Sequence, residues 1–89
     1  MPMRLSGEEP RLDEGAAGCL TFTLTDGHIL VPCRVEHAAL QEAFGPAGGN
    51  AMAIFRANRD AVVAGAIRTY ERAGTEGGVV RLAVADLAP

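Results

Sequence analysis

Three polar residues within one predicted helix are the first candidates for binding chemistry: Arg56, Asn58 and Arg59. Arg59 stands on or beside the apolar stripe of that helix, with Phe55 and Val62 as its neighbours at helical spacing. A guanidinium there must be paired or must reach water, because burying it alone is prohibitive. Its fork of N–H donors fits an anion or the carboxylate of a partner. The alternative is a structural ion pair of Arg59, for which the sequence offers Glu36, Glu42 and Asp26.

Cys33 is the one residue that resembles a nucleophile, because His37 follows it at the start of a predicted helix. A Cys–His pair also needs a third group to orient the base and a site for the oxyanion. We identify no candidate for either, and free cysteines are among the most buried residues of proteins. The sequence therefore predicts an inert thiol and no catalytic residues, and an enzyme is the least favoured function class.

The sequence predicts neither a metal site nor a cofactor. Cys19 and Cys33 belong to no CxxC or CxxH motif, and His28 and His37 provide too few ligands for a metal. Gly77 and Gly78 are part of no GxGxxG motif and have no lysine nearby, so a phosphate-binding loop is not supported. We expect both cysteines to be free, reduced thiols.

Length and charge limit the remaining function classes. The 89 residues allow one small domain, and 48% hydrophobic with 21% charged residues is typical of a globular chain. The net charge of −3 gives no general attraction to nucleic acid or anionic lipid. The chain contains no stretch long enough to span a membrane and no apolar leader at its start. The expected location is the cytoplasm, away from membranes, and nucleic acid is an unlikely partner.

The clearest structural signal is a β-hairpin. Residues 20–25 alternate apolar and polar side chains, Asp26-Gly27 is a favoured two-residue turn, and residues 28–35 form the second strand. This turn sets the predicted pairs, which are Leu24 with Ile29, Phe22 with Val31 and Leu20 with Cys33. All six side chains then share one buried face, with Cys19 on the other. Pro32 cannot donate to a neighbouring strand, which places the second strand at an edge of the sheet.

Two helices and a third strand follow. Residues 37–44 form a short helix that Gly45-Pro46 ends, and residues 51–73 form a long one that begins after Asn50. Its apolar stripe consists of Met52, Phe55, Val62, Ala66, Ile67 and Tyr70. Gly65 is unfavourable within a helix, so we expect it to pack closely against a neighbour. Residues 79–84 form a third strand, whose neighbour the sequence leaves open; the proline in the second strand favours a place beside the first.

These elements predict an α+β fold with two layers in the order β-β-α-α-β. A three-stranded antiparallel sheet is covered on one face by the two helices. The single domain spans residues 18–87, and residues 1–17 form a flexible acidic tail because they offer almost nothing to bury.

The same order of features resembles a known family of short proteobacterial proteins, the domain-of-unknown-function family DUF1488. The matching features are the DG turn, the Val31-Pro32-Cys33 strand, the short helix ending in Phe44-Gly45, and Phe55, Asn58-Arg59, Val62 and Tyr70 on one helix. The resemblance covers roughly residues 18–84 and implies the two-layer β-β-α-α-β fold. The chain departs from it at Glu36, where the family more often has a Ser or Thr helix cap, and in the plain loop at 46–49. The family has no established activity, so the resemblance implies none.

Two function classes remain. The first is a small non-catalytic module that acts through protein contact or regulation, with a homodimer as one form of that contact. Its candidate interface is the outer face of the sheet, at Leu30, Pro32 and Val79. The alternative is nucleic-acid or anion binding through arginines of the long helix, which are Arg56, Arg59, Arg68 and Arg72. Asp60 and Glu71 are interleaved with these arginines, which is typical of an ordinary solvated helix surface.

Overall fold

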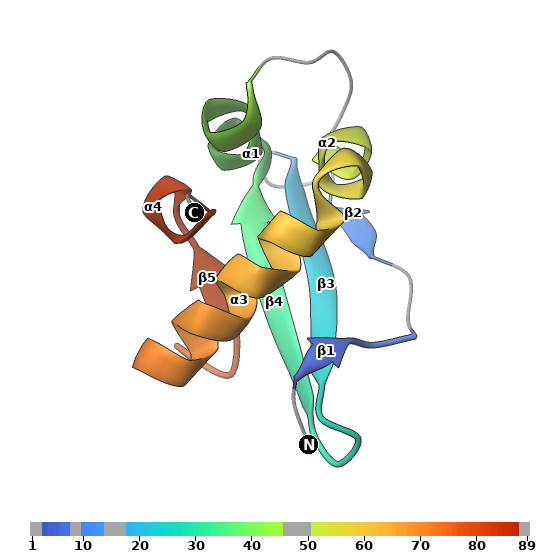
Figure 1. The fold of residues 1–89 in the computed structure, drawn as a ribbon, viewed down its shortest axis with the longest axis vertical. Helices are drawn as coiled ribbons and strands as arrows, with labels where there is room; N and C mark the ends of the chain where they lie inside the picture. The colour runs from blue at the N-terminus through green and yellow to red at the C-terminus, as the bar shows by residue number, and fades with distance from the viewer. Residues whose placement is uncertain (1–2, 8–9, 14–17, 46–50, 88–89) are drawn as a thin grey trace.

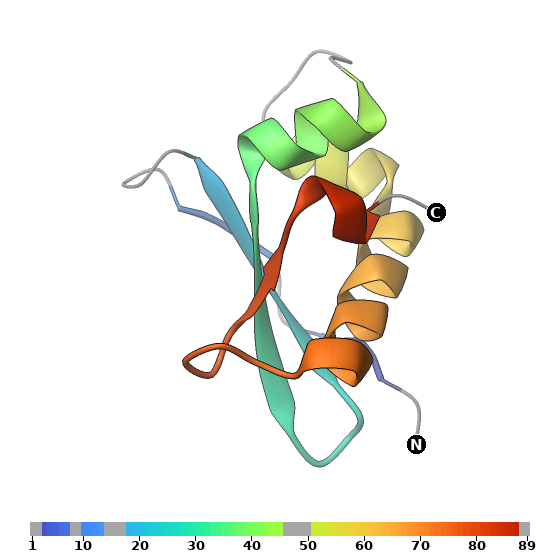
Figure 2. The same ribbon diagram turned by 90° about the vertical axis from the view of Figure 1, so that its left-hand side faces the viewer.

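The computed structural model describes residues 3–7, 10–13, 18–45 and 51–87. Figure 1 shows a sheet with helices packed across it, and Figure 2 shows that the helices lie on one face while the other face stays open. The elements are β1 (Arg4–Leu5), β2 (Arg11–Asp13), β3 (Cys19–Thr25), β4 (Leu30–Glu36), α1 (His37–Phe44), α2 (Ala51–Ala57), α3 (Arg59–Ala73), β5 (Val80–Leu82) and α4 (Val84–Leu87). The predicted α+β class is confirmed, but the sheet has five strands with mixed pairing rather than three antiparallel ones.

The central hairpin of β3 and β4 forms as predicted, but its register is shifted by two residues. The observed inner pairs are Leu20 with Val35, Phe22 with Cys33 and Leu24 with Val31. The predicted two-residue turn is wrong because residues 26–29 form a longer loop. Asp26 Oδ1 accepts the N–H groups of His28 at 2.8 Å and Ile29 at 3.0 Å. Side chains alternate with a period of two, so this shift keeps the predicted buried face and displaces only Ile29, which is 45% exposed.

The last strand, β5, lies beside β4 and parallel to it, with Cys33 opposite Val80 and Val35 opposite Leu82. The predicted pairing with the first strand is therefore wrong, and so is the edge position predicted for the second hairpin strand, because β4 lies between β3 and β5. The chain leaves β4 at one end of the sheet, passes through the helix layer and enters β5 at the opposite end, where β4 begins, and such a crossover gives parallel neighbours. Pro32 does not prevent this pairing because it precedes the paired part of β4.

The other side of β3 is occupied by the N-terminal segment. β1 and β2 both pair with β3 in antiparallel fashion, and Leu5 and Leu12 pack against the core. The prediction of a tail over residues 1–17 is therefore wrong for these two strands. Each of them contributes a single partly buried leucine, so the hydrophobic pattern of this acidic segment was too weak to predict a strand. Residues 8–9 and 14–17, which contain three of its acidic side chains, lie outside the described residues.

The helix layer differs from the prediction at Asn58, where the expected long helix divides into α2 and α3. Asn58 has φ −125° and ψ 26°, and its Nδ2 donates to the carbonyl of Ile54 at 3.0 Å. The short helix α1 has the predicted bounds and ends at Gly45, whose φ of 84° favours glycine. The predicted cap Asn50 lies outside the described residues. The final helix, α4, was not predicted, and it begins at Val84, where the third strand was expected to end.

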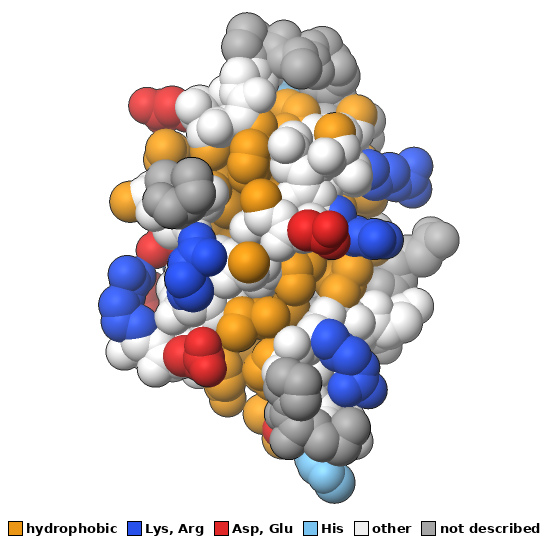
Figure 3. All heavy atoms as spheres, in the orientation of Figure 1, with side chains coloured by type: hydrophobic (Ala, Val, Ile, Leu, Met, Phe, Trp, Pro, Cys, Tyr) orange, Lys and Arg blue, Asp and Glu red, His pale blue; other side chains and the backbone are white. Residues whose placement is uncertain are grey.

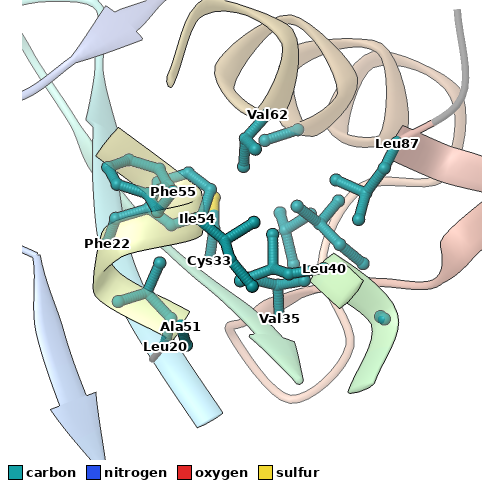
Figure 4. Packing of buried hydrophobic residues seen from close by; sticks show 14 of the residues in the cluster. Leu20, Phe22, Cys33, Val35, Leu40, Ala51, Ile54, Phe55, Val62 and Leu87 are labelled. Carbon is teal, nitrogen blue, oxygen red and sulfur yellow. The ribbon is translucent and has the colours of Figure 1, made fainter. Parts of the chain in front are cut away.

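The core fills the space between the sheet and the helices, as Figure 4 shows. Within it, Phe22 of β3 and Phe55 of α2 meet with ring centroids 5.2 Å apart. Val62 and Ala66 of α3 are also fully buried. The predicted apolar stripe of the helices therefore faces the sheet. The strand residues that point away from the helices form the open face.

Candidate functional site

The junction of α2 and α3 brings together the three predicted binding residues. Arg56, Asn58 and Arg59 line one shallow depression of about 330 Å³ together with Asp60. The Arg59 side chain is 62% exposed, and its Nε lies 4.0 Å from Oδ1 of the fully exposed Asp60. This partner was not among the predicted ones, and so exposed a pair contributes little to stability. Because the amide of Asn58 already donates to Ile54, the junction offers two solvated arginines and one carboxylate.

The other two arginines of the long helix have a structural role. Arg72 Nη2 lies 2.8 Å from Oδ1 of Asp86, and Arg68 Nη2 lies 3.4 Å from the carbonyl oxygen of Asp86. The second carboxylate oxygen of Asp86 accepts the N–H of Ala83 at 2.8 Å, and this hydrogen bond, together with Arg72, lowers the pKa of Asp86. These contacts fix α4 against α3. Figure 3 shows arginines and acidic residues spread around an apolar centre on the helix side, and not a basic patch.

The thiol of Cys33 is enclosed by the core. Its residue is 0% exposed, and its Sγ donates to the carbonyl of Val31 at 3.6 Å. Burial raises the pKa of Cys33 to about 12, so the reactive thiolate is strongly disfavoured. Both cysteines are free, and the register places them on opposite faces as predicted. His37 does not accept from this thiol, and among the described residues its buried Nε2 has no hydrogen-bond partner.

The buried thiol of Cys33 makes the free energy of unfolding depend on pH in the alkaline range. The unfolded thiol ionises near pH 9.0 and the folded one near 12, so its contribution to stability is full below pH 9.0 and is lost between these values. Urea unfolding of the wild-type chain and of Cys33→Val should therefore diverge above pH 9, with the wild-type chain losing more stability. The native Cys33 should also resist iodoacetamide at pH 8 until urea unfolds the chain. Rapid modification of Cys33 in the native state would contradict the burial.

The predicted interface residues lie at the open face and next to it. Leu30 and Pro32 point to the side of β4 away from the core, and Leu30 is 62% exposed. Val79 lies in a turn closed by hydrogen bonds with Glu76, directly before β5. Ile29 extends the exposed apolar surface at the hairpin loop. Sequence reasoning missed Ile29 because the two-residue turn placed it in the core.

A row of arginines crosses the open face and was not predicted. The register places Arg11 of β2 opposite Thr21 of β3, Thr21 opposite Arg34 of β4, and Arg34 opposite Arg81 of β5. Neighbouring strands are about 4.8 Å apart, so Arg34 and Arg81 leave the sheet side by side. Arg11 and Arg81 are exposed and Arg34 is half-buried. We call Arg11, Arg34 and Arg81 the arginine row.

The described open-face positions around the arginine row carry threonine, leucine, proline and charged side chains, and none of them is aromatic. Thr23 and Thr25 continue along β3, and Arg4 of β1 lies opposite Thr25. On the other side of the row, Glu36 of β4 stands opposite Cys19 and is exposed.

Comparison with known proteins supports the family resemblance. The chain matches the model of the family described as "Protein of unknown function (DUF1488)" over residues 10–82. The chain belongs to this family. The match to DUF1488 begins before the predicted residue 18 and includes β2 and all three residues of the arginine row. Neither a curated protein nor a solved structure matches the chain significantly.

Two absences among the described residues concern metals and membranes. No three His, Cys, Asp or Glu side chains among them gather into a group that could hold a metal ion. None of the helices within the described ranges has the length and apolarity to cross a bilayer.

Arg34 and Arg81 stand opposite each other on β4 and β5, and like charges in such a cross-strand pair repel each other. Replacing Arg81 with Glu places opposite charges at this cross-strand position. We expect the free energy of unfolding to rise by about 0.2–1 kcal/mol in low salt, measured by urea titration. Arg81→Gln should gain less, and high salt should reduce both gains by screening. A clear loss of stability in Arg81→Glu would show that Arg81 has a structural partner.

Proposed function

We propose that this chain is a non-catalytic interaction module whose open sheet face contacts a protein partner. The observation that carries the proposal is the exposure of Leu30, at 62%, on the same face as the arginine row. Interfaces between proteins are enriched in arginine and combine it with apolar contacts. An open sheet face that has no partner is usually covered by polar side chains alone. The inert thiol of Cys33 supports a role without catalysis.

The proposal also includes the cytoplasm as the location, and a second copy of the chain as one candidate partner. Cys19 and Cys33 are both free, which fits a reducing compartment. A dimer through this face would place identical patches in contact around a two-fold axis. The test below separates a second copy from other partners by the mass of the product.

Photo-crosslinking in cells of the source organism tests the proposal. A benzophenone amino acid replaces Leu30 on the open face or, as the control, the exposed Ala57 at the junction of α2 and α3. We expect a discrete protein adduct from position 30 and none from position 57. The absence of any protein adduct from position 30 would overturn the proposal.

Anion binding at the junction of α2 and α3 is the second candidate function. It is favoured by one observation, namely that Arg56 and Arg59 share a depression. The bonds of Arg72 and Arg68 to Asp86 weigh against a larger basic surface on this side. An adduct from position 57 alone would favour this candidate over the open face.

A further inference from the structure

The strand β1 and the helix α3 enclose a groove at one edge of the sheet. We infer that this groove binds an extended segment of a partner protein, which pairs with β1 as an added strand. Extended peptides commonly bind proteins by adding a strand at a sheet edge, with alternate side chains held in adjacent pockets. The inference concerns a different surface from the proposed function and does not depend on the arginine row.

The backbone of β1 is arranged to receive another strand. Within the described sheet, β1 pairs with β3 on one side and is itself an edge strand. The N–H of Ser6 donates to the carbonyl of Thr23 at 2.8 Å, and Leu5 stands opposite Leu24. In an antiparallel pair, residues that bond the partner strand alternate with residues that do not. Leu5 is of the second kind, so its N–H and C=O point to the outer edge, where an added strand needs a donor and an acceptor.

The groove beside this edge has a volume of about 560 Å³ and an apolar lining. It lies between residues 3–6 and one face of α3. The partly buried side chains of Met3, Leu5, Val63 and Ile67 line it. Every second side chain of an added strand points to the same face of the sheet, so alternate residues of the segment enter the groove. We therefore expect apolar residues at every second position of the segment.

Arg4 sets the chemistry of the remaining positions. It stands opposite Thr25 and is exposed, so its side chain lies on the face of β1 away from the groove. The segment residues between the apolar ones leave the added strand on this same face. An acidic residue there stands beside Arg4 as a favourable cross-strand pair. The matching segment therefore alternates apolar and acidic residues.

A second copy of the chain is a poorer match for this edge. Two β1 strands paired in antiparallel fashion about Leu5 would place Arg4 of one copy opposite Ser6 of the other. That arrangement provides no acidic group for Arg4. We therefore infer a partner of different sequence.

Fluorescence anisotropy with the purified full chain tests the inference. The probe is a labelled hexapeptide in which Val and Glu alternate, and two further forms carry N-methyl groups on the Val residues alone or on the Glu residues alone. Each methylated form blocks one edge of the extended peptide, because alternate N–H groups point to opposite edges. We expect the unmethylated peptide to bind, one methylated form to lose about tenfold or more in affinity, and the other to stay within about twofold.

Side-chain changes test the two faces of the added strand. A peptide with Ser in place of Val should lose binding, because it places nothing apolar in the groove. Arg4→Gln should weaken binding of the original peptide by about threefold. The matched control is Arg11→Gln, which removes the same charge from an exposed position of β2. We expect the control to leave the affinity nearly unchanged.

Each other outcome overturns the inference. Equal affinities of the two methylated forms would show that no strand is added, and a loss in both would show that binding does not use one edge of the peptide. Failure of the unmethylated peptide to bind would exclude this segment chemistry. A dimer in sedimentation analysis that Leu5→Pro dissociates would identify a second copy as the occupant. If crosslinking from position 30 succeeds while the peptide fails, the open face stands as a contact surface and only the groove is wrong.

Discussion

Replacing Gly65 with alanine is expected to destabilise the fold by about 2–3 kcal/mol, although the same change usually stabilises a helix. Gly65 lies in the middle of α3 and is buried beneath α4. A Cβ at this position would overlap the carbonyl oxygen of Asp86 and lie 3.3 Å from its carbonyl carbon. Both are backbone atoms, so they can move only if α4 moves with them. Urea unfolding measures the effect.

The clash at Gly65 outweighs helix propensity because α4 is firmly attached. Leu87 is only 1% exposed within the core, and Asp86 is bound by Arg72 and by the N–H of Ala83. Gly7→Ala is the matched control, since nothing lies within 4 Å of the Cβ that it adds. We expect that control to be nearly neutral. If Gly65→Ala instead raises stability by about 0.5–1 kcal/mol, α4 does not dock on α3 as the structure shows.

Gly65 also illustrates what local patterns can reveal. A glycine in the interior of an amphipathic helix predicts a close neighbour, and that prediction is confirmed. The neighbour itself was not predictable, because residues 84–87 form only one helical turn and follow a β-rich run. Short elements of this kind form through tertiary contacts and not through their own propensity.

The hairpin shows how a correct face can come with a wrong register. Alternation in residues 20–25 fixes which side chains are buried, and it gives the same answer for any even shift of the partner strand. The choice among even shifts depends on the loop. There the carboxylate of Asp26 accepts two backbone N–H groups and thereby stabilises a longer loop than the Asp-Gly dipeptide suggests.

The arginine row could not be predicted because it depends on which strands are neighbours and in which register. Its members come from β2, β4 and β5, which are far apart in the sequence, and only Arg34 lies in a strand whose position was correctly predicted. Arg11 fell within the predicted tail, and Arg81 in a strand placed at the wrong edge. The candidate residues of the long helix were local in sequence, so the structure does bring Arg56, Asn58 and Arg59 together. Binding sites that cross a sheet require its strand order, which single-sequence patterns do not supply.

Replacing Phe55 with alanine is expected to cost about 3–5 kcal/mol, the largest loss among the changes considered for this chain. Phe55 is 1% exposed, and its ring meets that of Phe22 at 5.2 Å with an interplanar angle of 33°. This contact joins α2 to β3, whose other side contributes Thr21 to the open face. Small domains have only about 5–15 kcal/mol of stability, so urea unfolding should show a large fraction lost.

Two comparisons separate the ring contact from simple loss of apolar volume. Phe44→Ala removes the same atoms from a half-buried position at the end of α1, so it should cost clearly less. In a double-mutant cycle, Phe22→Ala and Phe55→Ala should couple by about 0.5–1.5 kcal/mol, because the two rings contribute beyond their buried areas. Equal losses at Phe44 and Phe55 would show that α2 does not pack on β3 in solution. The helix layer would then no longer hold β3 in place. The register that aligns Arg11, Arg34 and Arg81 across the sheet would then have no packing to maintain it.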